Sequence, residues 1–456
     1  MFSLGLLAGC GGGGGSNAGG GGGAATQFSV RGPASSGAGF SFSFTVTALD
    51  ATGNVATSYT GTVQFTSSDP AAKLPTNSKL VSGTGTFSAT LPNAGFQTIT
   101  ATDTVSASLN KSLSVTAIAG EFPVSSFGAK GDGQTDDTSA IQTALNAAGA
   151  AGGGSVVLSV ARYFTSGTLV VPAGVVLTGP TEGPFDVTGI NPASTAVAAT
   201  LLITNTSGPF LTLHGIGSGA TDLLFHYPNQ GATSAAAPNV YPYTILVSAP
   251  GTKVARSTVT NAYDALDIES GRVTAQDLFI GGFHNDIKVD HAYDHVTLRH
   301  LDLDVFWDIV GIAQYPKPID TWVLNNGTAL VVGRADSLEL HEFFAFNRFI
   351  GMMFTDSSDA SQNPTCGYGT GGDIDIEGVQ YGMVVTASNT PGYKFTNLFL
   401  ESQSNIGIAA VQLRAGGSLP PKILINGVQQ GGPVPWIDGA FPSPPVGELV
   451  VVNIVP

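Results

Sequence analysis

Charged residues are scarce in this chain. They make up 11% of its 456 residues, against about a quarter in an average soluble domain. Acidic residues dominate, with 32 Asp and Glu against 17 Lys and Arg and a formal net charge of −15. Nucleic acids and anionic lipid headgroups bind clustered basic side chains, and no such cluster is present. We therefore expect no nucleic-acid partner, and we attribute the acidity to solubility outside the cell.

Cysteine and long apolar runs are also nearly missing. The two cysteines, Cys10 and Cys366, are too few for a disulfide framework, and no run of about 20 apolar residues is available to span a bilayer. Leu7-Ala8-Gly9-Cys10 instead matches a bacterial lipobox, in which the cysteine is lipidated and becomes the mature N-terminus. Residues 1–25 therefore predict a signal remnant and a Gly-rich tether. We expect an outer-membrane or cell-surface lipoprotein that touches the membrane through this anchor alone, or otherwise a secreted protein.

Residues 26–119 have the alternating, β-branched pattern of short strands. The segments 40–48, 60–66, 83–90, 95–102 and 111–117 alternate with turn residues every 8 to 12 positions, and no Trp occurs among them. This pattern is typical of a β-sandwich. The stretch TVTALDATGNVATSYTGTVQFTSSDP resembles bacterial Ig-like repeats, which implies a spacer. A carbohydrate-binding module is the alternative, but it would call for exposed aromatic residues.

A different pattern begins at residue 120. Gly128, Gly131 and Gly133 indicate turns, and Asp136 and Asp137 stand where the positive end of a helix favours acidic residues. Apolar residues on one helical face follow, and then come short strands at 156–158, 167–171 and 174–179. Beyond residue 201, short apolar strands and Asn, Asp or Gly turns recur at roughly 20-residue intervals, which is a solenoid period.

The opening FGAKGDGQTDDTSAIQTALNAA, followed by GTLVVPAGVVLTG, resembles the pectate-lyase-like superfamily, which includes polygalacturonases, rhamnogalacturonases, lyases and phage tailspikes. The resemblance implies an all-β fold, in which residues 120–456 form a right-handed parallel β-helix with an N-terminal capping helix. It leaves the chemistry open, because this opening serves hydrolases, lyases, epimerases and adhesins. The Asn-Thr-Asp, Gly-His-Gly and Arg-Ile-Lys motifs of polygalacturonases are absent from the coils.

Three aspartates recur at equal spacing in the predicted coils. Asp264, Asp286 and Asp308 lie 22 residues apart, and each follows an aromatic turn and opens an apolar strand. If they stack on successive coils, neighbouring residues stand about 4.8 Å apart. Stacked carboxylates favour either one raised pKa, as in glycosidic cleavage, or a bound cation such as Ca²⁺. Beyond a Ca²⁺ ion in this row, the sequence predicts no cofactor. Asp and Asn also occupy β-helix corners for purely structural reasons.

Further candidates accompany this row. His284 lies in the Asp286 turn and is a candidate acid or base, while Arg348 and Lys288 are candidate ligands of a substrate carboxylate. An aromatic row suited to sugar stacking is predicted from Tyr263, Phe283, Trp307, Phe346 and Tyr381.

Two functions remain open. The first is an extracellular enzyme that cleaves a polysaccharide, pectin-like or otherwise uronate-containing, by lyase or hydrolase chemistry in a groove along the β-helix. The second is a non-catalytic, tailspike-like surface protein that binds glycans. Related β-helix proteins also make a homotrimer one expected assembly, although no residue pattern demands it.

Overall fold

The computed structural model describes residues 23–180, 198–230, 237–304, 319–359, 361, 366–389, 391–402, 409–413, 422–431 and 448–455. Contacts divide the chain into two compact units, Met1–Ala119 and Gly120–Pro456. The division falls where the sequence pattern changes. Cys10, Trp307 and Asp308 lie outside the described residues, so the lipid anchor and these two candidate site residues stay predictions.

The first unit contains two sheets that share one core. One sheet is three-stranded, in the order β1 (Gln27–Arg31), β3 (Ser41–Leu49) and β6 (Thr84–Thr90). The other is five-stranded, in the order β2 (Ser35–Gly37), β8 (Asn110–Ile118), β7 (Gly95–Asp103), β4 (Thr62–Ser67) and β5 (Ser78–Lys79).

Alternation along these strands produces the sandwich. Phe44 and Val46 of β3 and Phe65 of β4 point inward and are buried in one cluster, while intervening residues such as Thr45 are less buried. The rings of Phe44 and Phe65 meet edge to face with centroids 5.6 Å apart, which joins the two sheets. The predicted β-sandwich is therefore present, while its Ig-like kinship stays a prediction.

The second unit opens with a short cap. It consists of β9 (Glu121–Pro123), the 3-10 helix η1 (Val124–Phe127), β10 (Asp132–Asp136) and the helix α1 (Thr138–Ala150). Ile141, Leu145 and Ala148 of α1 are fully buried. The Asp137 carboxylate accepts hydrogen bonds from the backbone N–H groups of Lys130 and Gly131, at 2.7 and 3.0 Å, and so fixes the preceding turn to the helix start. The predicted capping helix is thus present.

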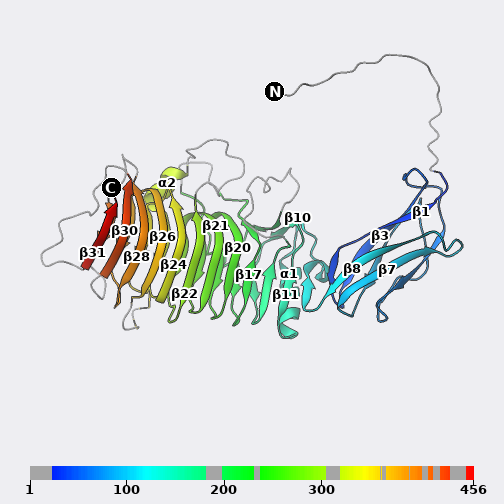
Figure 1. Ribbon diagram of the computed structural model, residues 1–456, viewed down its shortest axis with the longest axis horizontal. Helices are drawn as coiled ribbons and strands as arrows, with labels where there is room; N and C mark the ends of the chain where they lie inside the picture. Colours follow the sequence, from blue (N-terminus) through cyan, green and yellow to red (C-terminus); the bar gives the residue numbers. More distant parts are fainter. Residues whose placement is uncertain are drawn as a thin grey trace, which may run out of the picture. The chain divides into compact units, whose positions relative to one another are not determined.

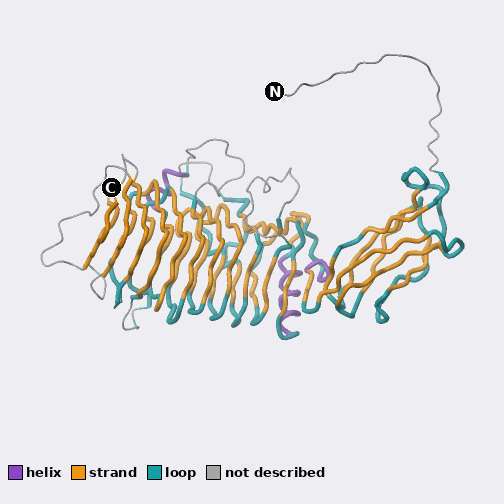
Figure 2. The backbone as a smooth tube through the Cα atoms, in the orientation of Figure 1, coloured by secondary structure: helices purple, strands orange, loops and turns teal. Residues whose placement is uncertain are grey.

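The remaining strands form a right-handed parallel β-helix with three faces, whose strands lie side by side in Figure 1 and whose turns line the lower edge in Figure 2. Face A contains β9, β11 (Gly154–Val157), β14 (Val175–Thr178), β17 (Gly219–Thr221) and the first halves of the long strands. Face B contains β10, β12 (Ala161–Thr165), β15 (Ala199–Ile203), β18 (Leu224–His226) and later parts of the long strands. Face C contains β13 (Leu169–Val171), β16 (Leu211–Leu213), β19 (Ile245–Val247), β23 (Thr328–Val332), β25 (Ile350–Phe354), β27 (Tyr381–Val385) and β29 (Ala409–Leu413).

The long strands each bend from one face to the next. Two of them, β20 (Lys253–Ile268) and β21 (Val273–Val289), run through all three faces. The others run from face A to face B and are β22 (Val296–Leu303), β24 (Asp336–Phe346), β26 (Tyr368–Val379), β28 (Tyr393–Ser402), β30 (Lys422–Gly431) and β31 (Glu448–Val455).

Stacked apolar side chains fill the interior. On face C, Leu266, Ile287, Leu330, Met352 and Met383 are partners in register on consecutive strands, and each is at most 1% exposed. Consecutive coils turn from face A to face B at a single residue with positive φ: Arg256, Asp277, His300, Glu342, Asp373 and Asn397. Asp, Asn and His adopt this left-handed backbone conformation more readily than most residues, which explains four of the six positions: Asp277, His300, Asp373 and Asn397.

Loops leave the β-helix at both ends of the face C strands. The described loop residues before these strands include 227–230, 237–244 and the helix α2 (Asp320–Asn326), and those after them include 355–359 and 386–389. None of the helices in the described residues is long and apolar enough to cross a membrane.

Candidate functional site

Of the predicted stack of aspartates, the two members that the structure describes, Asp264 and Asp286, do not stack on one another. Asp264 pairs in register with Asn285 rather than with Asp286, because the β20–β21 ladder shifts between Thr260 and Ala262 and again between Ala262 and Asp264. Asn285 in turn pairs with Thr328 of β23. Equal spacing in sequence therefore does not place Asp264 and Asp286 on one outward row.

Asp286 and Arg348 lie inside the β-helix. Arg348 Nε donates to Asp286 Oδ2 across 2.8 Å, and each side chain is 1% exposed. Arg348 Nη1 also donates to the backbone oxygens of Phe346 and Asn347. Burial raises the pKa of Asp286, although the Arg348 guanidinium opposes the rise. The expected catalytic role of Asp286 and the expected substrate contact of Arg348 are therefore wrong for this structure, since neither side chain reaches solvent.

The predicted aromatic row is also absent from the described residues. Phe283 is fully buried against Ile319 and Val323. Tyr381 is 9% exposed and packs edge to face on Phe349, so its expected role in stacking on sugar is wrong as well. Apolar packing, rather than ligand stacking, explains both rings.

The described residues do not fit the expected Ca²⁺ site. Among them, no group of three or more His, Cys, Asp or Glu side chains is arranged to hold a metal ion. Ca²⁺ takes several oxygen ligands, whereas Asp286 is already neutralised by a guanidinium.

One exposed acid–base pair does form where face C begins. His284 Nδ1 lies 2.9 Å from Asp264 Oδ1, and that oxygen also accepts the backbone N–H of Asn285 at 2.9 Å. An ionised carboxylate only accepts hydrogen bonds, so the neutral imidazole carries its proton on Nδ1 and its lone pair on Nε2. Asn285 Nδ2 lies 2.9 Å from Nδ1, and because two donors cannot share a hydrogen bond, a protonated Nδ1 requires the Asn285 amide to be turned so that its oxygen faces the imidazole. The side chains of His284 and Asp264 are 39% and 14% exposed.

Aromatic rings hold this imidazole in place. Tyr263 stacks on His284 with centroids 4.9 Å apart and planes 22° from parallel, and Trp322 of α2 lies 6.1 Å from Tyr263. Burial and the Asp264 charge raise the pKa of Tyr263, so its hydroxyl keeps its proton at neutral pH. Of the predicted site residues, Asp264, His284 and Tyr263 are thus brought together.

Tyr243 is a site residue that the sequence reasoning did not identify. It lies in the loop before β19, and its hydroxyl hydrogen-bonds the side chain of Asn285. Burial raises its pKa, and the charges of Asp264 and Asp267 raise it further. Apart from its two aromatic residues, the segment Tyr241-Pro242-Tyr243 has no sequence feature that indicates a functional role.

A second charged cluster lies further along face C. Lys288 Nζ lies 3.3 Å from Asp267 Oδ1 and 3.2 Å from Glu269 Oε1, and His291 Nδ1 lies 3.8 Å from Glu269 Oε1. Burial raises the pKa of Asp267 to about 6, opposed by Lys288 and assisted by Glu269. Burial alone would lower the pKa of Lys288, but the two carboxylates outweigh it and raise that pKa. Asp267, Glu269 and His291 were not identified as site residues, because none of them belongs to the equally spaced row of turn residues.

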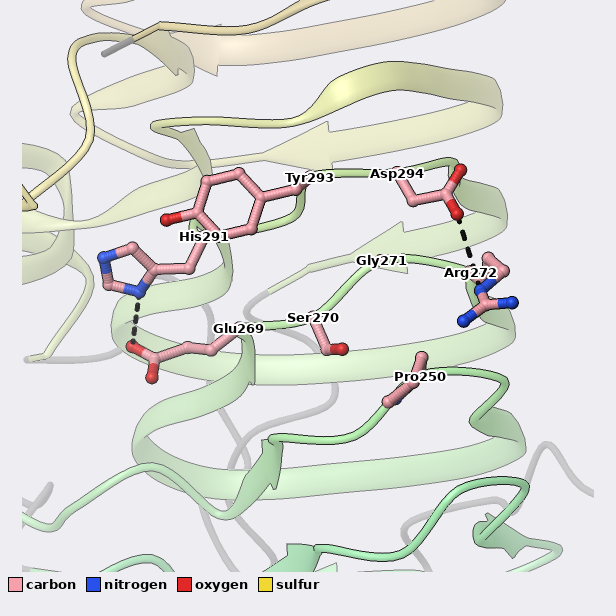
Figure 3. Close-up of a pocket in the computed structure, with 8 residues that line it drawn as sticks. All are labelled: Pro250, Glu269, Ser270, Gly271, Arg272, His291, Tyr293 and Asp294. Atoms are coloured by element: carbon pink, nitrogen blue, oxygen red, sulfur yellow. Dashed lines mark ion pairs between the residues drawn. The ribbon is translucent and has the colours of Figure 1, made fainter. Parts of the chain in front are cut away.

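A pocket of about 300 Å³ adjoins this cluster at the turns that follow face C. Figure 3 shows its lining residues, which are Pro250, Glu269, Ser270, Gly271, Arg272, His291, Tyr293 and Asp294. Glu269 and His291 belong to both the pocket and the charged cluster. The two clusters and the pocket therefore follow β20 and β21 from the start of face C to the turns beyond it.

Known proteins resemble parts of this chain. Residues 122–233 match the family described as rhamnogalacturonase A/epimerase, pectate lyase-like. An alginate lyase of Azotobacter vinelandii, alginate lyase 7, is 47% identical over 66 residues, which cover 13% of this chain and 8% of that protein. The mannuronan C5-epimerase AlgE3 of the same organism is 57% identical over 47 residues, or 10% of this chain and 3% of that protein. The chain thus spans under a tenth of either relative.

Among solved structures, a hyperthermoactive exopolygalacturonase from Thermotoga maritima aligns with 74% of this chain and 91% of its own, at 12% identity and a TM-score of 0.42. The coil arrangement described above agrees with the family match at residues 122–233. Residues 120–456 therefore form a right-handed parallel β-helix, and residues 122–233 within it match the pectate lyase-like family.

Proposed function

We propose that the β-helix unit is an extracellular lyase that cleaves a uronate-containing polysaccharide on face C. The observation that supports this most strongly is the pair formed by Asp264 and His284, because a carboxylate on Nδ1 leaves Nε2 of an exposed imidazole as a base. The partial likeness to an alginate lyase and to mannuronan C5-epimerases agrees with chemistry that begins at the proton next to a sugar carboxylate.

The groups around His284 supply the parts of a β-elimination. His284 Nε2 removes the C5 proton of the uronate, the C–H electrons form a C4–C5 double bond, and the C4–O bond breaks. The leaving oxygen takes the proton of the Tyr263 hydroxyl, which its raised pKa keeps in place until then. Asp264 stabilises the imidazolium that forms, as a carboxylate does in a Ser-His-Asp triad. Lys288 lies four residues further along β21, about 13 Å away, and is our candidate for binding the carboxylate of a neighbouring uronate in the same polysaccharide.

Hydrolysis is less well served by the described residues of face C. A hydrolase uses two accessible carboxyl groups, one as acid and one as base or nucleophile. Asp267 is paired with Lys288 and is 9% exposed, and Asp264 is engaged by His284 and by the Asn285 backbone. The imidazole is more exposed than either carboxylate.

The N-terminal parts fit display outside the cell. We propose that a lipid at Cys10 anchors the chain and that the β-sandwich of residues 26–119 is a spacer. A non-catalytic glycan-binding protein would use the same display, so activity has to be measured directly.

The test is to incubate the full chain with alginate, polygalacturonate and an uncharged polysaccharide. The ultraviolet absorbance of unsaturated uronate and the number of new reducing ends would be followed together. We expect both to rise together on a polyuronate. Reducing ends without absorbance would indicate a hydrolase, and exchange of the C5 proton with solvent deuterium without cleavage would indicate an epimerase. Glycan binding without any of these signals would instead support the alternative, a non-catalytic glycan-binding protein.

A further inference from the structure

The pocket beyond face C is built around an exposed aromatic ring. Tyr293 is 47% exposed, although a tyrosine gains little by facing water. In Figure 3 its ring lies between the Glu269–His291 pair on one side and the Arg272–Asp294 pair on the other. It is thus part of the pocket's lining rather than part of the core.

Tyr293 is also held in position. The guanidinium of Arg334 lies over its ring, 4.7 Å from the centroid, in a cation–π contact. Arg334 is itself fixed, because Nε and Nη2 donate to the two oxygens of Asp336 at 3.2 and 2.9 Å and its backbone N–H donates to Asp290. A ring whose orientation is set in advance loses little entropy when a ligand stacks on it.

Polar groups of both kinds surround the ring. Arg272, His291 and the Ser270 hydroxyl offer donors, while Glu269 and Asp294 offer carboxylate acceptors. The Arg272–Asp294 pair is loose, with Nε and Oδ2 3.4 Å apart and both side chains more than half exposed, so both remain accessible to a ligand. Glu269 is offset by Lys288 and Asp294 by Arg272, so the pocket has no surplus positive charge for an anionic ligand and suits one whose hydroxyls both donate and accept.

We propose that this pocket is a subsite for an uncharged, hydroxyl-rich sugar residue, which stacks on Tyr293 and hydrogen-bonds Arg272 and Asp294. The proposal rests on the proposed function in that the sugar belongs to the same polysaccharide. The pocket shares Glu269 and His291 with the Lys288 cluster, so a bound chain passes from one to the other. The preferred substrate is then a heteropolysaccharide that carries neutral residues beside its uronates, whereas a polyuronate is cleaved without filling this pocket.

The test measures binding in the full chain carrying His284→Ala, which prevents turnover. Uncharged gluco-, manno- and galacto-oligosaccharides and a mannuronate oligosaccharide of equal length would be titrated by calorimetry and by saturation-transfer NMR. We expect at least one uncharged oligosaccharide to bind, and Tyr293→Ala and Arg272→Gln each to weaken it about tenfold. Tyr293→Phe should bind nearly as the parent does, because it keeps the stacking surface.

The matched control is Arg299→Gln, which removes an arginine that is 61% exposed and pairs with Glu342 on face A. It should leave binding unchanged. The proposal is overturned if no uncharged oligosaccharide binds, if Tyr293→Ala binds as tightly as the parent, or if Arg272→Gln weakens the mannuronate oligosaccharide instead. Absence of unsaturated product in the wild type would count against the lyase and not against this binding result.

Discussion

Arg348 and Asp286 form an ion pair inside the β-helix, with Nε and Oδ2 2.8 Å apart and both side chains 1% exposed. Removing one partner leaves a buried charge without a counter-charge, so we expect Arg348→Met or Asp286→Asn to lower the free energy of unfolding by about 3–5 kcal/mol. The double variant Asp286→Leu/Arg348→Met should recover most of that loss. Denaturant titration measures all three. Single variants as stable as the wild type, with a raised KM, would return both residues to the substrate site.

Asp264 should control rate rather than stability. Asp264→Asn removes the acceptor that holds the proton on His284 Nδ1, so we expect kcat to fall by roughly 10²–10⁴ with KM little changed. Because the Asp264 side chain is part-exposed, the midpoint of thermal unfolding should move by only a few degrees. A variant with wild-type kcat would remove Asp264 from the mechanism.

Asp290 should stabilise the fold at neutral pH. Burial opposes its charge, but hydrogen bonds from Ser357, Ser358 and the Arg334 backbone prevail and lower its pKa to about 2. Since the folded pKa lies below the usual 3.8, this stabilisation is present above about pH 4 and is lost as the pH falls through about 2. We expect the free energy of unfolding of the wild type to exceed that of Asp290→Asn by about 2 kcal/mol at pH 7 and by much less near pH 2. A difference independent of pH would contradict the assignment.

Asp267 should act in the opposite sense. Its pKa of about 6 in the fold exceeds the usual 3.8, so its contribution is complete below about pH 4 and is lost as the pH rises through 6. The stability of Asp267→Asn relative to the wild type should therefore increase by about 2–3 kcal/mol between pH 4 and pH 7. Denaturant unfolding of both proteins across that pH range measures this difference. If the Asp267 carboxyl had an ordinary pKa, the difference in free energy of unfolding would not change with pH.

The fold was readable from the sequence because local signals agreed with one another. The Gly-rich turn, the acidic helix start and the apolar face at Ile141, Leu145 and Ala148 correspond to the observed cap. Alternation at residues 40–48 likewise corresponds to β3 (Ser41–Leu49), whose inward residues share the core of the sandwich.

The site could be predicted only in part, because the register between neighbouring strands does not follow from the spacing of residues in the sequence. Register shifts near Ala262 place Asn285, and not Asp286, beside Asp264. The equal spacing therefore led to the wrong prediction that Asp286 faces outward. Tyr243 reaches the site from a loop whose path no periodicity describes. His284 was found because it lies beside the turn that the aspartates marked.

The central claim is that His284 removes a proton from the substrate, and a second His–Asp pair in the same chain provides a matched control. His300 Nδ1 lies 2.7 Å from Asp277 Oδ1 at a corner between faces A and B, away from face C. The decisive measurement is the rate of unsaturated uronate formation from the most reactive polyuronate by the wild type, His284→Ala and His300→Ala. We predict that His284→Ala loses at least about 10²-fold in kcat while His300→Ala keeps the wild-type rate. Equal rates in all three proteins would contradict the account.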